Sequence, residues 1–302
     1  MTDKGLKAAN ALLAMQRHPW EQGFAAQAFY EAGRNDIWLP MARECAFRAA
    51  PDGRLSLMSD SNGVCDPASA GEVCLRAWEK TGDRYFRRAA DNMLAYINTM
   101  APKTKEGYVY HTLNRKQLWS DSGYMLPPFL HAMGDTAQAY RQYEGYDRYL
   151  KDSATGLYTH IFDFENSAAC DRRIWATGNA WILMGLLRIG SGNTEVLLDN
   201  MLGYLRTDGL FHDVLNDPTS FTDGTTALMT AYVIFRGVRE GTLSAKYLDK
   251  AEKAYTVNAD SMDYLGIIHG VCGAPRFNEQ GTSAEAQAAF ILADSEREKV
   301  RS

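Results

Sequence analysis

The stretch Gly156-Leu-Tyr-Thr-His160 separates two amphipathic segments, residues 137–150 and 175–189, and this succession decides the fold. In both segments apolar residues recur every three or four positions, which predicts helices that each bury one face. The stretch between them begins with glycine and then alternates aromatic, β-branched and polar residues, which is typical of a short strand. The sequence here predicts a helix, a short β-like loop and a second helix.

The same succession recurs along the chain, with glycine-led loops also at Gly53-Arg-Leu-Ser-Leu, Gly107-Tyr-Val-Tyr-His111 and Gly209-Leu-Phe-His212. Helical periodicity predicts twelve helices, at residues 6–15, 24–32, 38–49, 70–80, 85–100, 121–133, 137–150, 175–189, 194–205, 225–240, 244–255 and 284–294. Six hairpins with short β-like loops on one rim indicate an all-α fold, an (α/α)6 barrel. The varied hairpin lengths favour this closed barrel over a straight solenoid. No linker interrupts the chain, so we expect residues 1–302 to form a single catalytic domain.

The composition is that of an ordinary globular protein, with 302 residues, 46% hydrophobic residues, 23% charged residues and a net charge of −5. No run of Lys or Arg is present, so nucleic acid and anionic membranes are not expected as partners. No apolar stretch approaches the roughly 18 residues of a membrane span, and residues 11–15 are too short for a secretion signal. We expect a cytoplasmic protein, a monomer or a homodimer.

The five cysteines are odd in number and widely spaced, at Cys45, Cys65, Cys74, Cys170 and Cys272. This pattern predicts reduced, buried thiols and argues against a disulfide framework or a structural zinc site. No HExxH motif occurs and no two histidines lie four residues apart, so we expect no metal and no cofactor. The absence of GxSxG, P-loop and GxGxxG motifs argues against serine hydrolases, NTPases and dinucleotide enzymes.

The segment Leu118-Trp-Ser-Asp121-Ser-Gly-Tyr124 holds the first candidate catalytic acid, Asp121, at the predicted start of a helix. Asp is favoured at such a position as a helix cap, which is the alternative. The flanking Trp119 and Tyr124 favour a chemical role, because aromatic walls remove water and thereby favour a protonated carboxyl group.

A second candidate acid, Asp66, precedes Pro67, which suits the first position of a helix with Asp66 as its N-cap. Asp66 and Asp121 belong to successive predicted hairpins. In a closed barrel both would face the same central opening, where two carboxyl groups can act as a general acid and base. Each acid alone remains open to the simpler interpretation as a cap.

Aromatic residues and histidines gather at predicted helix ends and loops, which is typical of a site for a sugar. Trp20 and Trp175 are candidate stacking platforms, although Trp20 would also serve as an anchor to the core. Thr282 and Ser283 either cap a helix or bind a carboxylate at its positive end. The other candidates for substrate binding are His111, Trp119, Tyr124, His160, Asn179, Trp181 and His212, of which Trp181 also suits packing within a helix.

Seven motifs in order resemble the unsaturated uronyl hydrolases, specifically glycoside hydrolase family 105 and, more distantly, family 88. They cover residues 17–287 and read HPWEQG, DPAxxGE with WEKTGDRY, LWSDSxYMxxPFL, GLYxH, WxxGNAW, GLFHxVLxDP and GTSAEAQ. The resemblance implies an (α/α)6 barrel acting on oligosaccharides that end in a 4,5-unsaturated uronic acid. It also implies that Trp20, His111, Trp175 and Trp181 surround this substrate.

The resemblance further implies hydration of the C4=C5 double bond, with Asp121 donating a proton to C4 and Asp66 as its partner. Two positions depart from the family pattern: Thr177 stands where an arginine is frequent, and Asp223 where a glutamate is common. The arginine would pair with a carboxylate, so the sugar in the leaving-group subsite stays open. An inverting glycosidase, a sugar epimerase using the loop histidines and a non-enzymatic helical scaffold are the alternatives.

Overall fold

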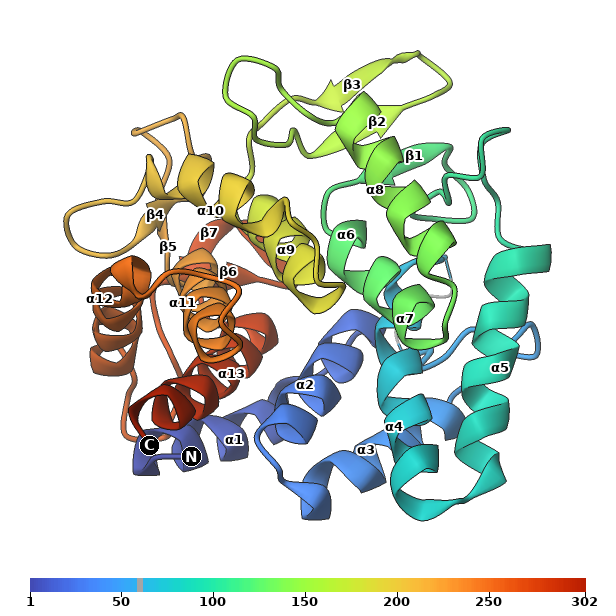
Figure 1. The fold of residues 1–302 in the computed structure, drawn as a ribbon, viewed down its shortest axis with the longest axis horizontal. Helices are drawn as coiled ribbons and strands as arrows, with labels where there is room; N and C mark the ends of the chain where they lie inside the picture. Colours follow the sequence, from blue (N-terminus) through green and yellow to red (C-terminus); the bar gives the residue numbers. More distant parts are fainter. Residues whose placement is uncertain (59–61) are drawn as a thin grey trace. The chain divides into compact units, whose positions relative to one another are not determined.

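The computed structural model describes residues 1–58 and 62–302, and most of these residues are helical (Figure 1). Their contacts divide the chain into two compact units. The first unit comprises Met1–Gln16, Glu31–Gly33 and Ile174–Ser302, and the second comprises Arg17–Tyr30 and Arg34–Arg173. The candidate acids Asp66 and Asp121 both belong to the second unit.

In the second unit, consecutive helices pack in pairs, α4 against α5 and α7 against α8, while η1 contacts α6. Its sheet has three antiparallel strands in the order β1-β2-β3. The helical elements are α2 (Pro19–Glu31), whose last residue falls in the first unit, α3 (Asn35–Phe47), η1 (Asp66–Ala70), α4 (Gly71–Thr81), α5 (Arg84–Thr99), α6 (Ser122–Met125), α7 (Pro127–Ala132) and α8 (Thr136–Tyr149). The strands are β1 (Gln117–Trp119), β2 (Ile161–Asp163) and β3 (Ala168–Asp171).

In the first unit, α11 packs against α9, α12 and α13, and α1 packs against α13 from the other end of the chain (Figure 1). The helical elements are α1 (Asp3–Met15), α9 (Ala176–Arg188), α10 (Thr194–Leu202), α11 (Gly224–Arg239), η2 (Ala245–Tyr247), α12 (Leu248–Asp260) and α13 (Ala284–Arg301). Two strand pairs, β4 (Phe211–His212) with β5 (Thr222–Asp223) and β6 (Val271–Gly273) with β7 (Arg276–Gly281), lie in its loops.

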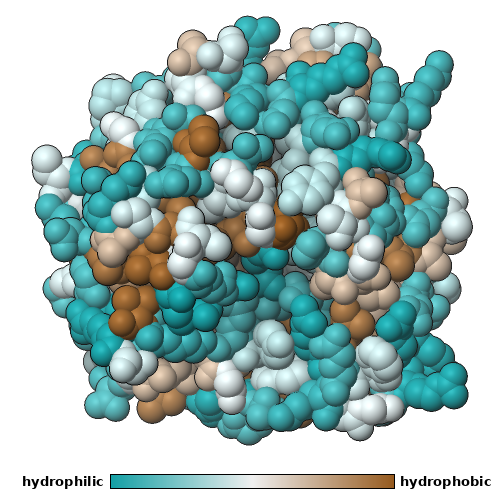
Figure 2. Space-filling view, viewed as in Figure 1, coloured by the Kyte–Doolittle hydropathy of each residue, from teal (hydrophilic) through white to brown (hydrophobic). Residues whose placement is uncertain are grey.

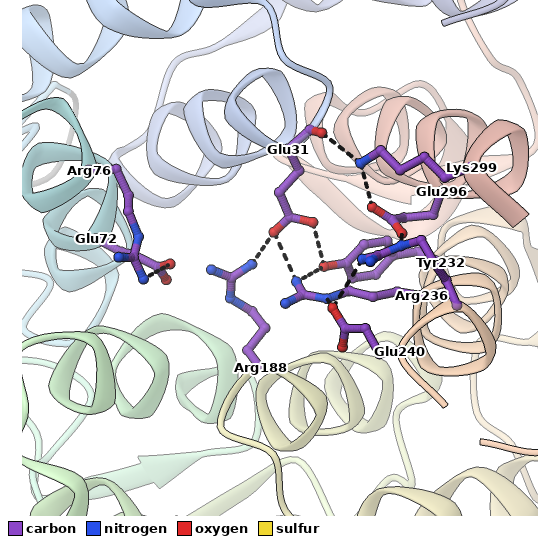
Figure 3. Close-up of polar contacts among 10 residues, drawn as sticks. Glu31, Glu72, Arg76, Arg188, Tyr232, Arg236, Glu240, Glu296 and Lys299 are labelled. Atoms are coloured by element: carbon purple, nitrogen blue, oxygen red, sulfur yellow. Dashed lines mark hydrogen bonds and ion pairs between the residues drawn. The ribbon is translucent and has the colours of Figure 1, made fainter. Parts of the chain in front are cut away.

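Within the first unit, a buried polar network surrounds Glu31 (Figure 3). The carboxylate of Glu31 accepts hydrogen bonds from Arg188, from Arg236 at 3.1 Å and from the Tyr232 hydroxyl at 2.8 Å. Its carbonyl accepts a further bond from Lys299 at 3.0 Å. These partners belong to α9, α11 and α13, so Glu31 joins two helices through its carboxylate and a third through its carbonyl.

Each of the twelve predicted helices has a counterpart, but the prediction of one helix over residues 121–133 is wrong. The segment is divided into α6 and α7, which meet at Leu126. Pro127 and Pro128 follow this junction, and proline lacks the N–H that a continuous helix requires. The last helix also runs to Arg301, beyond the predicted residue 294.

The glycine-led loops are placed correctly, but most contain less strand than predicted. Residues 209–212 include β4, whereas residues 107–111 and 156–160 hold only isolated bridges, at Val109 and Tyr158. Gly156 and Gly209 have φ values of 69° and 91°, a left-handed conformation in which glycine has no steric penalty. Glycine therefore marks the turn from a helix into each loop.

Side-chain burial separates four of the five cysteines from the fifth. Cys45, Cys65, Cys74 and Cys272 are buried as predicted, and burial raises the pKa of the Cys45 thiol to about 12. The prediction is wrong for Cys170, which is exposed.

None of the described helices is both long and apolar enough to cross a membrane. Figure 2 shows a largely hydrophilic face with separate hydrophobic patches.

Candidate active site

His111 lies between the two candidate acids of the second unit. Its Nε2 is 3.8 Å from Asp66 Oδ2, and its Nδ1 is 3.7 Å from Asp121 Oδ1. All three side chains are largely buried, with exposed fractions of 5% for His111, 11% for Asp66 and 18% for Asp121. The structure thus brings together, around one imidazole, two carboxyl groups that are 55 residues apart in the sequence.

Main-chain hydrogen bonds hold His111 in this place. Its carbonyl accepts the N–H of Val64 at 2.9 Å, and its own N–H donates to the carbonyl of Gln117 at 2.9 Å. His111 is therefore joined on one side to the segment that leads into Asp66 and on the other to β1, which leads into Asp121. The expectation that Asp66 is an N-cap is wrong: Asp66 is the first residue of η1, and the N-cap residue is Cys65.

Asp121 precedes α6 but makes no side-chain capping bond to it. Among the described residues, its Oδ1 atom is buried and has no hydrogen-bond partner. An unpartnered buried carboxylate oxygen is costly in a protein interior and is a frequent sign of a functional site. The helix-cap alternative therefore does not account for Asp121.

Ser122 is a member of this cluster that sequence reasoning missed. Its Oγ lies 2.8 Å from His111 Nδ1, and the residue is 1% exposed. A hydroxyl group can donate to or accept from either form of an imidazole, so Ser122 orients the ring without fixing its charge. The available signal was the pair of serines that flanks Asp121 in Trp-Ser-Asp-Ser.

Aromatic side chains form one wall of the cluster. The Trp119 ring stacks on His111, with centroids 4.3 Å apart and planes inclined by 10°. His160 meets Trp119 edge-on at 5.6 Å. Tyr124 is buried and meets Phe24 edge-to-face at 5.2 Å. Of the predicted aromatic and histidine candidates in this unit, Trp119 contacts both His111 and His160.

Trp20, the remaining candidate of the second unit, stacks on His18 with ring centroids 4.3 Å apart. Glu21 shapes this turn, because its Oε2 accepts the backbone N–H groups of Arg17 and His18. Burial raises the pKa of Glu21, against the lowering effect of these two hydrogen bonds. Glu21 therefore sets the position of Trp20 at the start of α2, as a capping residue does.

The candidates of the first unit are engaged in local hydrogen bonds. Trp175 precedes α9, and its indole N–H donates to Asp213 at 3.1 Å. The Asn179 amide donates to the Trp175 carbonyl at 2.9 Å, and Trp181 is 3% exposed within α9. The burial of Trp181 agrees with the prediction that it packs within the helix. Asn179 fixes the turn that carries Trp175.

Both ring nitrogens of His212 are used. Nδ1 lies 2.9 Å from the Ser220 carbonyl and Nε2 lies 2.8 Å from Arg206 Nη1. Since a carbonyl only accepts and a guanidinium only donates, this imidazole is neutral with its proton on Nδ1. Ser283 caps α13 by accepting the N–H of Ala286 at 3.0 Å, while Thr282 is exposed.

The two departures from the family pattern are in direct contact. Thr177 donates its hydroxyl to Asp223 Oδ2 at 2.9 Å, and both residues are buried. Asp223 also accepts the N–H groups of Thr225, Thr226 and Cys272. A threonine and an aspartate thus satisfy one another where an arginine and a glutamate were expected, so the two substitutions form one interaction.

No group of three or more His, Cys, Asp or Glu side chains in the described part of the chain is arranged to hold a metal ion. The cluster of the second unit offers carboxyl, imidazole and hydroxyl groups. Paired carboxyl groups beside an imidazole are suited to proton transfer.

Comparison with known proteins defines the class as a glycoside hydrolase. The family model described as Glycosyl Hydrolase Family 88 matches residues 8–190 and 193–300, nearly the whole chain. The chain therefore belongs to Glycosyl Hydrolase Family 88, and the predicted resemblance to the related family 105 is confirmed by its relatives.

One such relative is the unsaturated rhamnogalacturonyl hydrolase YesR of Bacillus subtilis (strain 168), 25% identical over 248 residues that cover 74% of this chain and 70% of that protein. A family 105 glycoside hydrolase of C. acetobutylicum ATCC 824 has a similar structure, with a TM-score of 0.80 at 17% identity over 98% of this chain and 99% of its own. An unsaturated glucuronyl hydrolase specific for heparin matches with a TM-score of 0.72 at 13% identity, over 99% and 96% of the two chains. The predicted fold class, an all-α (α/α)6 barrel, is confirmed by these structures.

Proposed function

We propose that this chain removes a 4,5-unsaturated uronic acid from the non-reducing end of oligosaccharides left by polysaccharide lyases. Family membership supports a glycosidase, and the names of the relatives, an unsaturated rhamnogalacturonyl hydrolase and an unsaturated glucuronyl hydrolase, support this substrate class. The observation that carries the proposal in this chain is the buried Oδ1 of Asp121, which receives no hydrogen bond from the described residues and lies 3.7 Å from His111 Nδ1, with Asp66 near the other ring nitrogen.

In the proposed reaction Asp121 acts first as an acid and then as a base. It donates a proton to C4 of the unsaturated sugar, and positive charge develops at C5 and is shared with the ring oxygen. Water adds at C5 and returns a proton to Asp121, so the net change is the addition of one water molecule. The resulting hemiketal opens, and the C1 hemiacetal then releases the rest of the glycan as an alcohol.

Asp66 and His111 support this proton transfer. Asp66 is the proposed partner of Asp121, and the His111 imidazole lies between the two carboxyl groups. His111 contacts both acids and hydrogen-bonds Ser122, which fixes the imidazole between them. We assign His111 to orienting the substrate and the two carboxyl groups, with the Trp119 ring as the adjacent stacking surface.

The remaining substrate contacts follow from residue type. Trp20 and Trp175 are proposed stacking surfaces, and Thr282, being exposed, is available for a polar contact.

The family match over both units supports one catalytic domain spanning residues 1–302. Five cysteines without a disulfide support a reducing compartment, and we propose the cytoplasm.

The test is turnover of a panel of lyase-generated unsaturated disaccharides, followed by the loss of ultraviolet absorbance of the conjugated acid. We expect at least one member of the panel to lose absorbance with wild-type protein. The matched saturated disaccharides should stay intact. Turnover of saturated sugars alone would contradict the proposal and favour an ordinary glycosidase.

A second measurement separates hydration from direct attack at the anomeric carbon. In deuterated water, protonation of the double bond places deuterium at C4 of the released sugar, which mass spectrometry and NMR detect. Direct hydrolysis leaves C4 without deuterium and keeps the double bond. A product that retains its ultraviolet absorbance would therefore overturn the assignment of Asp121 as the donor to C4.

A further inference from the structure

His160 is held at one end of the three-stranded sheet of the second unit by its main chain. Its carbonyl accepts the N–H of Ser120 at 3.0 Å, and its N–H donates to the Arg173 carbonyl at 3.0 Å. Ser120 directly precedes Asp121, and Arg173 follows shortly after β3. The backbone of His160 is thereby fixed between the strand that leads into the proposed acid and the strand that ends at Asp171.

The Asp171 carboxylate accepts several hydrogen bonds. It accepts His160 Nδ1 at 2.9 Å, and it accepts Arg173 through Nη2 at 2.7 Å, through Nε at 3.0 Å and through the backbone N–H at 3.0 Å. Burial favours the neutral acid, but the hydrogen bonds from His160 and Arg173 hold the pKa of Asp171 well below its usual value. Because an ionised carboxylate only accepts, the His160 proton must lie on Nδ1 in the neutral ring.

Two ring contacts connect the His160 ring to His111, the neighbour of the proposed acid Asp121. His160 meets Trp119 edge-on at 5.6 Å with planes inclined by 72°, and Trp119 stacks on His111 at 4.3 Å. The Trp119 indole is also held from the side, because its N–H donates to Gln117 Oε1 at 3.0 Å. Rotation of His160 would therefore disturb the wall on which His111 rests, 3.7 Å from Asp121.

We infer that Asp171, which accepts hydrogen bonds from Arg173, is a positioning residue. It fixes the tautomer and the ring orientation of His160 and, through Trp119, the position of the aromatic wall of the active site. This inference rests on the proposed function for its effect on turnover, but not for its effect on His160. Asp171 was not among the residues expected from the sequence to form the site. Carboxylate partners that orient functional histidines elsewhere typically change activity about 10- to 100-fold when removed.

The experiment compares wild-type protein with Asp171→Asn and Asp171→Ala. Nitrogen-15 NMR of the six histidine side chains at alkaline pH reports which ring nitrogen carries the proton. We expect the Nδ1–H form for His160 in the wild type, and a shift toward the Nε2–H form in both variants. On the substrate panel, kcat/KM should fall about 10- to 100-fold, with Asp171→Asn the milder change because it keeps the shape of the side chain.

Asp36→Asn is the matched control. Asp36 forms the same two-residue-spaced pair with an arginine, Arg34, through bonds of 2.9 and 2.7 Å, but this pair is exposed and contacts none of the site residues. We expect wild-type turnover and a wild-type His160 tautomer in this variant. If the Asp171 variants keep the wild-type tautomer, or change it without altering kcat/KM, the inference is overturned.

Failure of the proposed function gives a different result. If wild-type protein turns over no unsaturated disaccharide, the tautomer shift in Asp171→Asn still tests the positioning of His160. Should Asp171→Ala fail to fold, Asp171→Asn, which keeps the side-chain shape, provides the same comparison. A wild-type tautomer in folded Asp171→Asn would contradict the inference whatever the activity.

Discussion

Asp223 and Asp121 both stand at the start of a helix, and the structure uses them in opposite ways. Asp223 precedes α11 and accepts the N–H groups of Thr225, Thr226 and Cys272 together with the Thr177 hydroxyl. Asp121 precedes α6, caps nothing, and has a buried oxygen for which the described residues provide no donor.

The difference concerns free hydrogen-bonding capacity. Both oxygens of the Asp223 carboxylate accept hydrogen bonds from the protein, whereas the described residues give Asp121 Oδ1 no hydrogen bond. A sequence motif identifies both as acids at helix starts, but only the count of partners separates a structural carboxylate from a chemical one.

The largest expected effect is that of Asp121→Asn on turnover. Because the amide cannot deliver a proton, we expect kcat to fall about 10²- to 10⁴-fold. The thermal midpoint should stay close to that of the wild type, since no side-chain capping bond is lost. Initial rates on an unsaturated disaccharide and a melting curve test this, and a variant with wild-type kcat would sink the assignment.

The same substitution at Asp223 should have the opposite effects, a loss of stability with little change in activity. Asp223→Asn replaces an acceptor by a donor amide that faces buried N–H groups, and we expect the free energy of unfolding to fall by about 3 kcal/mol. Activity per folded molecule should remain within a few-fold of wild type. Denaturant unfolding measures the loss, and a variant as stable as Asp121→Asn would break the comparison.

Local sequence patterns predicted the helices well, because apolar periodicity and turn glycines are set by neighbouring residues. The split at Pro127 and Pro128 was also readable, since proline ends a helix by its own chemistry. Short strands were misplaced because a two- or three-residue strand is defined by its partner. β1, for example, exists only through its pairing with residues 161–163, more than forty positions away.

The roles of individual polar residues were harder to predict. Nothing local shows that Ser122 would meet His111, or that Asp171 would meet His160, since each pair is joined by tertiary packing over 11 positions. Thr177 was noted as a departure, but its hydrogen bond to Asp223, 46 positions away, needs the fold. Roles of Asp66 and Asp121 came from the family resemblance, and these stay predictions.

The two serines on either side of Asp121 offer a further comparison between a hydrogen-bonded side chain and one without a partner, with a smaller expected effect on activity. Ser122 hydrogen-bonds His111, whereas the buried Ser120 hydroxyl has no partner among the described residues. We expect Ser122→Ala to lower kcat/KM about tenfold, the equivalent of one hydrogen bond. Ser120→Ala, one residue on the other side of Asp121, should leave kcat/KM within twofold, and equal losses in both variants would contradict the role of Ser122.

Asp171 lies between the two extremes, because it is fully hydrogen-bonded like Asp223 but one of its partners is a histidine of the site. Its pKa is lowered in the folded protein, against the effect of burial, by His160 and Arg173. Its contribution to stability is therefore complete above the pKa of an unfolded aspartate, about 3.9, and is lost as the pH falls through the lower folded value.

We accordingly expect Asp171→Asn to melt below the wild type near neutral pH, by the smallest margin of these changes, and the gap to narrow as the pH falls below about 4. Thermal midpoints of both proteins across this range provide the measurement. Asp36→Asn should give a smaller gap that high salt removes, because the Asp36 side chain is 63% exposed. A gap at Asp171 that does not depend on pH would mean that its charge is irrelevant, and Asp171 would then stabilise the loop by shape alone.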